Sequence, residues 1–192
     1  MMDRDARIRD AIERVKTWMQ AHGAGALVEN LAPGHTRERL DHFEAAVGFP
    51  LPADLRALWS VHAGQRSEQN GFVGAMDLFG PDASLGEEDA VSSALKFLRR
   101  APAQWAEAGV TREEAKSNAW LAIAGRGYAD LLVVNGETGR VFTCEKISPP
   151  LHLVAESILD WLEAYAERVE AGQYAVKEGF GDCYLVRPDA MY

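Results

Sequence analysis

Residues 48–65 constrain the fold more than any other part of the chain, because they carry the start, the apolar face and the end of one short helix. Pro52 suits the first helical position, since its missing N–H would be unpaired there and its fixed φ is already helical. Gly64 stands where the chain must leave the helix, a place that favours a residue tolerant of positive φ. The apolar stripe of this helix consists of Leu51, Leu55, Leu58, Trp59 and His62. The segment is therefore predicted to be a packed helix without catalytic chemistry of its own.

Further helices are predicted over residues 5–21, 36–47, 89–108 and 153–171, where apolar residues recur at helical spacing. The residues expected to begin, interrupt or end these helices are Gly23, Thr36, Gly48, Pro102 and Gly172. Thr111-Arg-Glu-Glu114 matches a capping box and predicts one more short helical turn.

Strands are predicted at residues 72–79, 119–124, 130–134, 140–144 and 183–186, which are compact apolar runs bounded by turn residues. The turn at residues 135–139 makes a hairpin of residues 130–144, and residues 81–88 are predicted to be a loop. Helices, then a block of strands, then a helix indicate an α+β fold with a mainly antiparallel sheet and helices packed around it. We expect one domain over residues 1–192, with the helix at 5–21 as an extension.

The composition excludes several classes of protein. A formal net charge of −9 argues against nucleic acid as the main partner, because phosphate contacts require clustered Lys and Arg. The chain lacks a run of the roughly 20 apolar residues that span a bilayer. The charged start lacks the apolar core of a signal peptide, so we expect a cytoplasmic protein. Cys144 and Cys183 are too few for a disulfide framework and are expected to be reduced.

Three patterns with possible chemistry are better explained as ordinary structure. His35, Glu38 and His42 do not make a metal site, since zinc needs three or four ligands with supporting partners. Gly125-Arg-Gly127 lies between two strands and lacks the spacing of a phosphate-binding loop, so it is interpreted as a tight turn. A Gly-x-Ser-x-Gly nucleophile motif is missing. We therefore expect neither catalysis nor a cofactor nor a metal.

Acidic residues stand out in the charge pattern, because residues 67–95 contain no Lys or Arg. The acids of this stretch are Glu68, Asp77, Asp82, Glu87, Glu88 and Asp89, and those near the last helix are Glu156, Asp160, Glu163, Glu167 and Glu170. One interpretation is a solvated loop with an ordinary polar helix face. The other is an acidic face for a basic partner, formed by Asp77, Asp82, Glu87, Glu88 and Asp89.

Residues 51–59, followed by Ala63-Gly-Gln65, resemble the helix that marks the SUKH superfamily. That group includes the Smi/Knr-type cell-wall assembly regulators of yeast and many bacterial immunity proteins. Residues 120–124, 130–134, 139–141 and 157–162 resemble, in order, its Trp-containing strand, following strand, hairpin return and final helix. The resemblance covers residues 36–174. The residues that match its structural motifs are Leu51, Pro52, Leu55, Trp59, Gly64, Trp120, Asp130, Gly139 and Trp161.

Three residues depart from the family pattern. Ala63 stands where Asn is frequent, Ala129 where Gly often precedes the Asp, and Asn135 where an Asp is common. Roles that depend on those side chains are therefore not carried over, whereas the fold is.

The resemblance implies a protein-binding module without catalytic chemistry. In bacteria such proteins are commonly encoded beside a toxin, frequently a nuclease, and neutralise it by binding. An acidic inhibitor suits a basic nuclease, because a surface that attracts phosphate also attracts carboxylates. The first hypothesis is a cytoplasmic immunity protein whose partner is a basic toxin domain. Two alternatives stay open: a regulatory or scaffold protein of the same fold, and a small hydrolase or metal enzyme whose site converges only in three dimensions.

Overall fold

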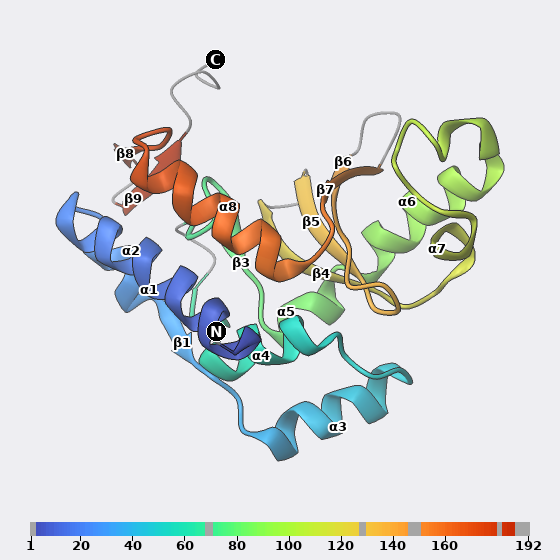
Figure 1. The fold of residues 1–192 in the computed structure, drawn as a ribbon, viewed down its shortest axis with the longest axis horizontal. Coiled ribbons are helices and arrows are strands. Elements are labelled where there is room, and N and C mark those ends of the chain that lie inside the picture. The colour runs from blue at the N-terminus through green and yellow to red at the C-terminus, as the bar shows by residue number, and fades with distance from the viewer. Residues whose placement is uncertain (1–2, 68–70, 127–129, 146–150, 180–181, 187–192) are drawn as a thin grey trace.

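A five-stranded antiparallel sheet lies at the centre of the fold (Figure 1). The computed structural model describes residues 3–67, 71–126, 130–145, 151–179 and 182–186. The strands follow the order β3 (Asp77–Leu78), β4 (Trp120–Arg126), β5 (Asp130–Asn135), β6 (Val141–Glu145) and β7 (Leu151–Ala155). Two smaller antiparallel pairs join β1 (Leu31–Pro33) to β2 (His62–Gln65) and β8 (Ala175–Gly179) to β9 (Asp182–Val186). The prediction of an α+β fold with an antiparallel sheet is confirmed.

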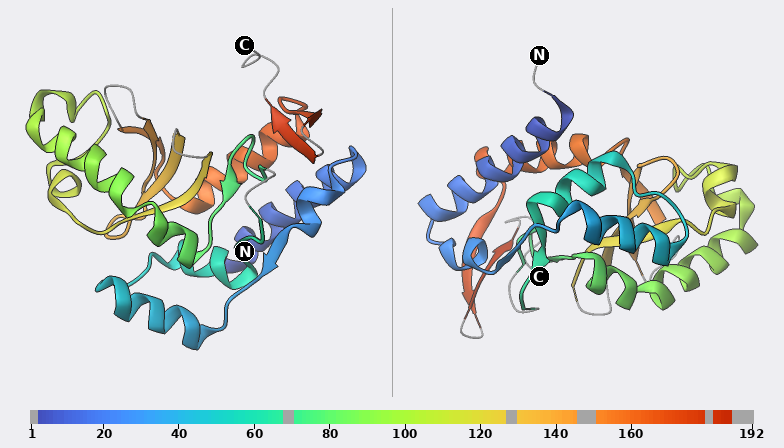
Figure 2. Two further views of the ribbon diagram at one scale, coloured as in Figure 1. Left: turned by 180° about the vertical axis from the view of Figure 1, so that it is seen from behind. Right: turned by 90° about the horizontal axis from the view of Figure 1, so that it is seen from below.

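Helices cover both faces of this sheet. The first face carries α1 (Arg4–Ala21), α4 (Ala53–Val61) and α8 (Ile158–Glu170), and the second carries α6 (Glu88–Arg100) (Figures 1 and 2). The remaining helices are α2 (Gly25–Glu29), α3 (Arg37–Val47), α5 (Pro81–Gly86), the 3-10 turn Pro102–Gln104 and α7 (Arg112–Lys116).

The central strands β4 and β5 are buried on both faces, so their apolar runs are continuous rather than alternating. Alternate side chains of each strand enter two hydrophobic cores, one on each side of the sheet. Those in the first core include Leu121, Ile123, Leu132 and Val134, and those in the second include Trp120, Ala122, Leu131 and Val133. A bulge between Ala122 and Ala124 shifts this alternation, and Ala124 joins Ile123 in the first core.

Local capping signals in the sequence are confirmed. Thr36 accepts a hydrogen bond from the Arg39 N–H at the start of α3, and Gly48 ends that helix with a φ of 80°. Thr111 and Glu114 form the predicted capping box at the start of α7. These signals were readable because each depends only on residues within one helical turn.

The ends of α4 differ from the prediction. Pro52 is the N-cap rather than the first helical residue, and the helix ends at Val61, so His62 belongs to β2. Gly64 does have positive φ, at +87°, but within β2 rather than at a helix end. A Cβ on Gly64 would lie 2.2 Å from the Gly80 nitrogen, so glycine is required there by close backbone packing as well as by φ.

The prediction of a loop over residues 81–88 is wrong. Pro81 takes the first position of α5, where its fixed φ is helical, and α6 begins at Glu88. The strand expected over residues 72–79 is reduced to Asp77–Leu78, because the chain from Phe72 to Met76 forms a short bridged turn.

The long helix predicted over residues 153–171 is shorter at its start. Leu151–Ala155 forms the edge strand β7, and α8 begins after Ser157, whose side chain accepts from the Asp160 N–H. Gly125 and Arg126 extend β4 rather than forming a turn, and Gly127 lies outside the described residues. The strand predicted at residues 183–186 is confirmed as part of β9, and its partner β8 was not predicted.

Candidate functional site

Four of the predicted partner-binding acids lie close together in the chain where α5 meets α6, and we call them the acidic junction: Asp82, Glu87, Glu88 and Asp89. Asp82 is in the first turn of α5, and Glu88 and Asp89 are in the first turn of α6. These three side chains are exposed, and Glu87 is half-buried between the two helices. Negative charge at a helix N-terminus is stabilised by the helix dipole, so the acids also favour the start of α6.

Asp77, another acid of residues 67–95, does not join that surface. Asp77 is half-buried on β3, where it pairs with Gly125, and its Oδ1 is buried. Glu68 lies outside the described residues. Asp82 approaches Arg39 of α3 with an Nη2–Oδ2 distance of 3.5 Å, and both side chains are largely exposed. A pair so exposed is screened by solvent, so it leaves the acidic junction open to a partner's cations.

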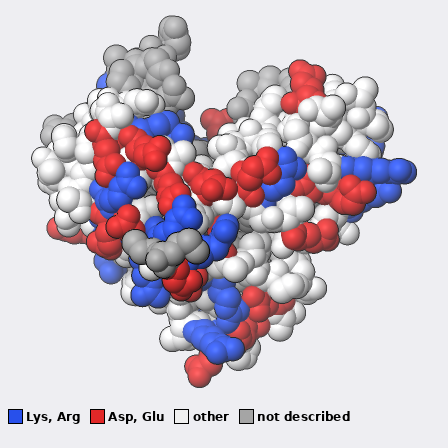
Figure 3. All heavy atoms as spheres, in the orientation of Figure 1, with Lys and Arg blue, Asp and Glu red and all other residues white. Residues whose placement is uncertain are grey.

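Two acids of α8 pair with α1, and Glu156, which precedes α8, pairs with Arg140 beside the β5–β6 turn. Glu163 pairs with Arg7 at 2.7 Å, Glu170 pairs with Arg14, and Glu156 pairs with Arg140 at 2.9 Å. The hydrogen bond from Arg14 lowers the pKa of Glu170. Acidic and basic side chains accordingly alternate over α1 and α8 (Figure 3). These internal pairs remove Glu156, Glu163 and Glu170 from the candidate acidic surface.

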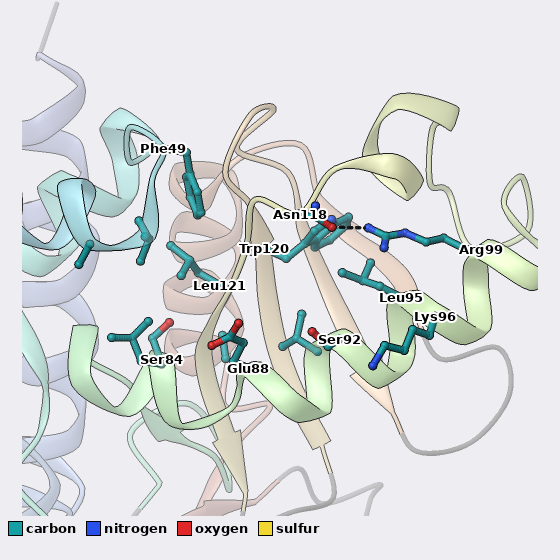
Figure 4. A pocket seen from close by; sticks show the side chains of 15 residues that line it. Phe49, Ser84, Glu88, Ser92, Leu95, Lys96, Arg99, Asn118, Trp120 and Leu121 are labelled. Carbon is teal, nitrogen blue, oxygen red and sulfur yellow. Dashed lines mark hydrogen bonds between the residues drawn. The ribbon is translucent and has the colours of Figure 1, made fainter.

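A pocket of about 470 Å³ lies beside the acidic junction (Figure 4). Its lining comes from the end of α3 and the residues after it, from α5 and α6, from Asn118 and from the first half of β4. The lining side chains labelled in the figure are Phe49, Ser84, Glu88, Ser92, Leu95, Lys96, Arg99, Asn118, Trp120 and Leu121. We call this pocket the β4 groove.

One side of the β4 groove is a polar row along α6. Glu88, Ser92 and Lys96 follow one another at four-residue intervals, so they lie along one line of the helix (Figure 4). The row is acidic at one end and basic at the other, with Glu88 and Lys96 both exposed. This arrangement can recognise a partner that carries charges of both signs.

Arg99 fixes the far end of the groove. Its Nε donates to the Ala115 oxygen at 2.8 Å, and its Nη2 donates to Ser117 O and Asn118 Oδ1, both at 2.8 Å (Figure 4). The guanidinium therefore joins α6 to the residues that lead into β4, and the groove wall is held in place before any partner binds.

The buried acidic side chain Glu114 has structural partners. Its Oε2 accepts from Arg140 Nη1 at 2.8 Å and from the Thr111 N–H at 2.9 Å. Its Oε1 accepts from Thr138 Oγ1 at 2.7 Å. The Glu114 side chain, engaged at both oxygens, therefore joins α7 to the β5–β6 turn.

Other titratable groups in the core are held in the same way. The Tyr165 hydroxyl donates to Phe72 O at 2.7 Å and accepts from the Gly74 N–H at 3.0 Å. Burial raises the pKa of Tyr165 far above its usual value, so it stays protonated. Burial lowers the pKa of His62 and His35. Among the described residues, no three His, Cys, Asp or Glu side chains are placed to hold a metal ion.

The residues that match the family motifs are mostly parts of the core. Leu51, Leu55 and Trp59 are buried against the first core, and Trp59 Nε1 donates to Phe79 O at 2.9 Å. Trp161 of α8 is buried there too, whereas Trp120 lies in the second core and donates to Glu114 O at 3.2 Å. The others lie nearer the surface or at turns: Pro52 caps α4, Gly139 has a φ of +75°, and Asp130 is exposed at the start of β5.

Asp54 is a structurally important residue that the sequence patterns did not reveal. Its Oδ2 accepts from Arg4 Nη2 at 2.8 Å and from the Leu159 N–H of α8 at 3.1 Å, so it links α1, α4 and α8. Burial alone would raise the pKa of Asp54, but the hydrogen bonds from Arg4 and Leu159 outweigh it and the pKa is lowered. The only local signal was an acid in the first turn of a helix, which is common.

The β4 groove was likewise not predicted from the sequence. Its lining comes from segments more than 70 residues apart, and most of its side chains are of types found on any helix face. In the part of the chain that the structure describes, no helix is long and apolar enough to cross a membrane.

Comparison with known families gives one match. The sequence model of the SMI1 / KNR4 family (SUKH-1) matches residues 34–164, which is more than half of the 192 residues. The matched region runs from before α3 into α8 and includes the acidic junction and the β4 groove, whereas α1 precedes it. No curated protein matches the chain.

Proposed function

Because the chain belongs to the SMI1 / KNR4 family (SUKH-1), we propose that it is a bacterial immunity protein that neutralises a toxin by direct binding. The partner in this proposal is a basic toxin domain, such as a nuclease, and the chain acts in the cytoplasm without catalysing a reaction. Proteins of this family are commonly immunity proteins, which is the main support for this function.

The acidic junction is the observation that supports a basic partner. Asp82, Glu88 and Asp89 are exposed on adjacent helices. By contrast, two acids of α8 are engaged with Arg7 and Arg14, and Glu156 before α8 is engaged with Arg140. The formal net charge of −9 would also speed the encounter with a positively charged protein. A surface that binds nucleic acid phosphates presents the Lys and Arg side chains that this junction would contact.

Charge reversal at the acidic junction tests the proposal. In Glu88→Lys/Asp89→Lys, affinity for the toxin encoded by the adjacent reading frame should fall about tenfold or more at low salt, mainly through slower association. The deficit should shrink above about 0.5 M salt, where charges more than a few ångströms apart are screened. Isothermal titration calorimetry and stopped-flow mixing at several salt concentrations measure both effects.

A matched control separates the site from the overall charge. Asp5 and Glu113 are also exposed acids in the first turns of helices, so Asp5→Lys/Glu113→Lys changes the net charge and the helix dipoles in the same way. The control variant should bind the toxin within about twofold of the wild type. Equal affinity of both double variants would show that the acidic junction does not contact the toxin.

A further inference from the structure

Helix α6 lies outside the sheet, and its outward face is open to solvent (Figure 2). The four buried apolar residues of the helix turn inward to the second core. The outward side carries exposed residues: Asp89, Ser93, Lys96, Phe97 and Arg100. The Phe97 side chain is large and apolar, and the residue is 44% exposed. A phenyl ring among charged side chains offers an apolar contact to another molecule.

The charges on this face are separated along the helix. Asp89 lies in the first turn, whereas Lys96 and Arg100 lie in the second half. In the part of the chain that the structure describes, none of these three side chains forms an ion pair. Neighbouring helices extend both ends, since α5 carries the exposed Asp82 and α7 carries the exposed Lys116. The face therefore has an acidic end and a basic end.

Such a face is complementary to itself when two copies meet with their α6 helices antiparallel. Each contact then occurs twice, because the copies are related by a two-fold axis. Asp89 and Arg100 are eleven residues apart, close to three full turns, so they share one line of the helix. With the axis midway between them, Asp89 of each copy faces Arg100 of the other. A parallel pair would instead bring Asp89 against Asp89 and Arg100 against Arg100.

The same arrangement covers the exposed phenyl ring. Phe97 of one copy comes to lie between Ala90 and Ser93 of the second copy, on the side of the helix that all three residues share. Both of these residues are small, so the ring can approach the helix surface of the other copy closely. Two rings, one on either side of the axis, thereby lose contact with water, which favours association.

We propose that two copies of the chain associate through their α6 helices, which run antiparallel across a two-fold axis. Asp89 of each copy pairs with Arg100 of the other, and each Phe97 packs on the opposite helix. A helix of 13 residues is only about 20 Å long, so the interface is smaller than that of a stable complex. The dimer is therefore weak, with a dissociation constant on the order of 100 µM.

The negative charge of both copies does not prevent this contact. Each copy has a formal net charge of −9, but charges outside the interface are screened over about 8 Å at 0.15 M salt. The proposal does not rest on the proposed function. It has one consequence for it, because Asp89 belongs to the acidic junction and a basic partner would compete with the second copy for it.

Sedimentation equilibrium of the full chain from about 10 µM to 1 mM measures the association. The wild type should show a monomer–dimer equilibrium. In 15N NMR spectra over the same concentrations, the amide signals of α6 should shift. A wild type that stays monomeric at 1 mM, or shifts that map to another face, would overturn the proposal.

Two charge variants test the pairing itself. In Asp89→Arg two arginines face each other, and in Arg100→Asp two aspartates do, so each variant alone should dimerise about tenfold more weakly or worse. An equimolar mixture of the two variants has opposite charges at both contacts and should associate about as tightly as the wild type. Both variants keep a negative net charge, so general attraction between them cannot cause this result. A mixture that stays monomeric would contradict the proposed pairing.

The apolar contact is tested by Phe97→Ser, which should weaken the association about tenfold. Val154→Ser is the control, because Val154 is 42% exposed but lies on β7. Its neighbour Leu153 packs against the second core, so Val154 points to the opposite face of the sheet from α6. The control should dimerise within about twofold of the wild type. Equal dissociation constants of Phe97→Ser and the wild type would refute the contact. None of these measurements uses a toxin, so their failure is distinguishable from a failure of the immunity function.

Discussion

Asp54 links three helices that lie over the first core, α1, α4 and α8. It is 6% exposed, and it accepts hydrogen bonds from Arg4 of α1 and from the first turn of α8 while it belongs to α4. A buried carboxylate is tolerated in such a place only because these donors compensate for the loss of water. The Asp54 carboxylate therefore helps to orient the helices over the first core, in addition to their apolar packing.

Asp54→Asn should lower the free energy of unfolding by about 1–3 kcal/mol at pH 7, because Arg4 loses its charged partner. The pKa of Asp54 is lower in the folded chain than in the unfolded one, so its carboxylate stabilises the fold above the unfolded pKa, about 3.9. This contribution is lost as the pH falls through the folded pKa. The difference in unfolding free energy between variant and wild type should be constant from pH 7 to about 5 and should shrink below about 4.

Urea titrations at a series of pH values measure this difference. Asp5→Asn is the control, because Asp5 is an exposed acid in the first turn of α1. A difference for Asp54→Asn that stays the same at every pH at which the chain folds would contradict the account.

Residues whose role is local were predictable, and residues whose role is set by distant contacts were not. Thr36, Gly48 and Thr111 act within one helical turn, so the sequence pattern was sufficient. Gly64 has the expected positive φ, but it does not end a helix. Glycine is needed there because the backbone of Gly80, 16 residues away, packs against it. Asp54 carries no distinctive pattern, because its donors lie 50 and 105 residues away along the chain.

At the level of elements, α1 is attached to α8 by both charge and apolar packing. Arg7 and Arg14 each form two-pronged hydrogen bonds to Glu163 and Glu170 of α8. The apolar face of α1 is buried in the first core through Ile8, Ala11, Ile12, Val15 and Met19. The exposed pairs set the alignment of the two helices, and the apolar face supplies most of the stabilisation.

Ile12→Ala should therefore lower the free energy of unfolding by about 2–4 kcal/mol, since it empties a fully buried site. A double-mutant cycle on Arg14 and Glu170 should give a coupling below about 1 kcal/mol, because solvent screens this pair. Urea denaturation of Ile12→Ala, Arg14→Ala, Glu170→Ala and the double variant measures both quantities. A coupling that exceeds the Ile12→Ala effect would show that the ion pairs hold α1.

The elements missed from the sequence share a physical cause. Leu151–Ala155 is a short apolar run next to a helix, and such a run fits a strand or a helix turn equally well by periodicity. Ser157 is the N-cap of α8. A serine at this place is the local signal that the helix begins only after it, so that residues 151–155 lie outside the helix. The short length of β3 has no sequence signal, because it depends on where the chain leaves the sheet before α5.

At the scale of the whole molecule, the two cores share the strands β4 and β5. A sheet buried on both faces ties the helices of the first face to α6. The order of helices and strands was enough to predict the α+β class, since it follows from the pattern of apolar residues alone. The candidate acidic surface was only partly predictable: the acids were visible in the sequence, but their internal pairing was not.

In the proposed function, this chain protects a cell from a toxin by binding it. The most direct measurement is the growth of bacteria that express the product of the adjacent reading frame, with and without the chain. The account predicts that this product alone stops growth, that the wild-type chain restores it, and that Glu88→Lys/Asp89→Lys restores it less well than Asp5→Lys/Glu113→Lys. A product that is harmless alone, or toxicity that the wild-type chain does not relieve, would contradict the claim.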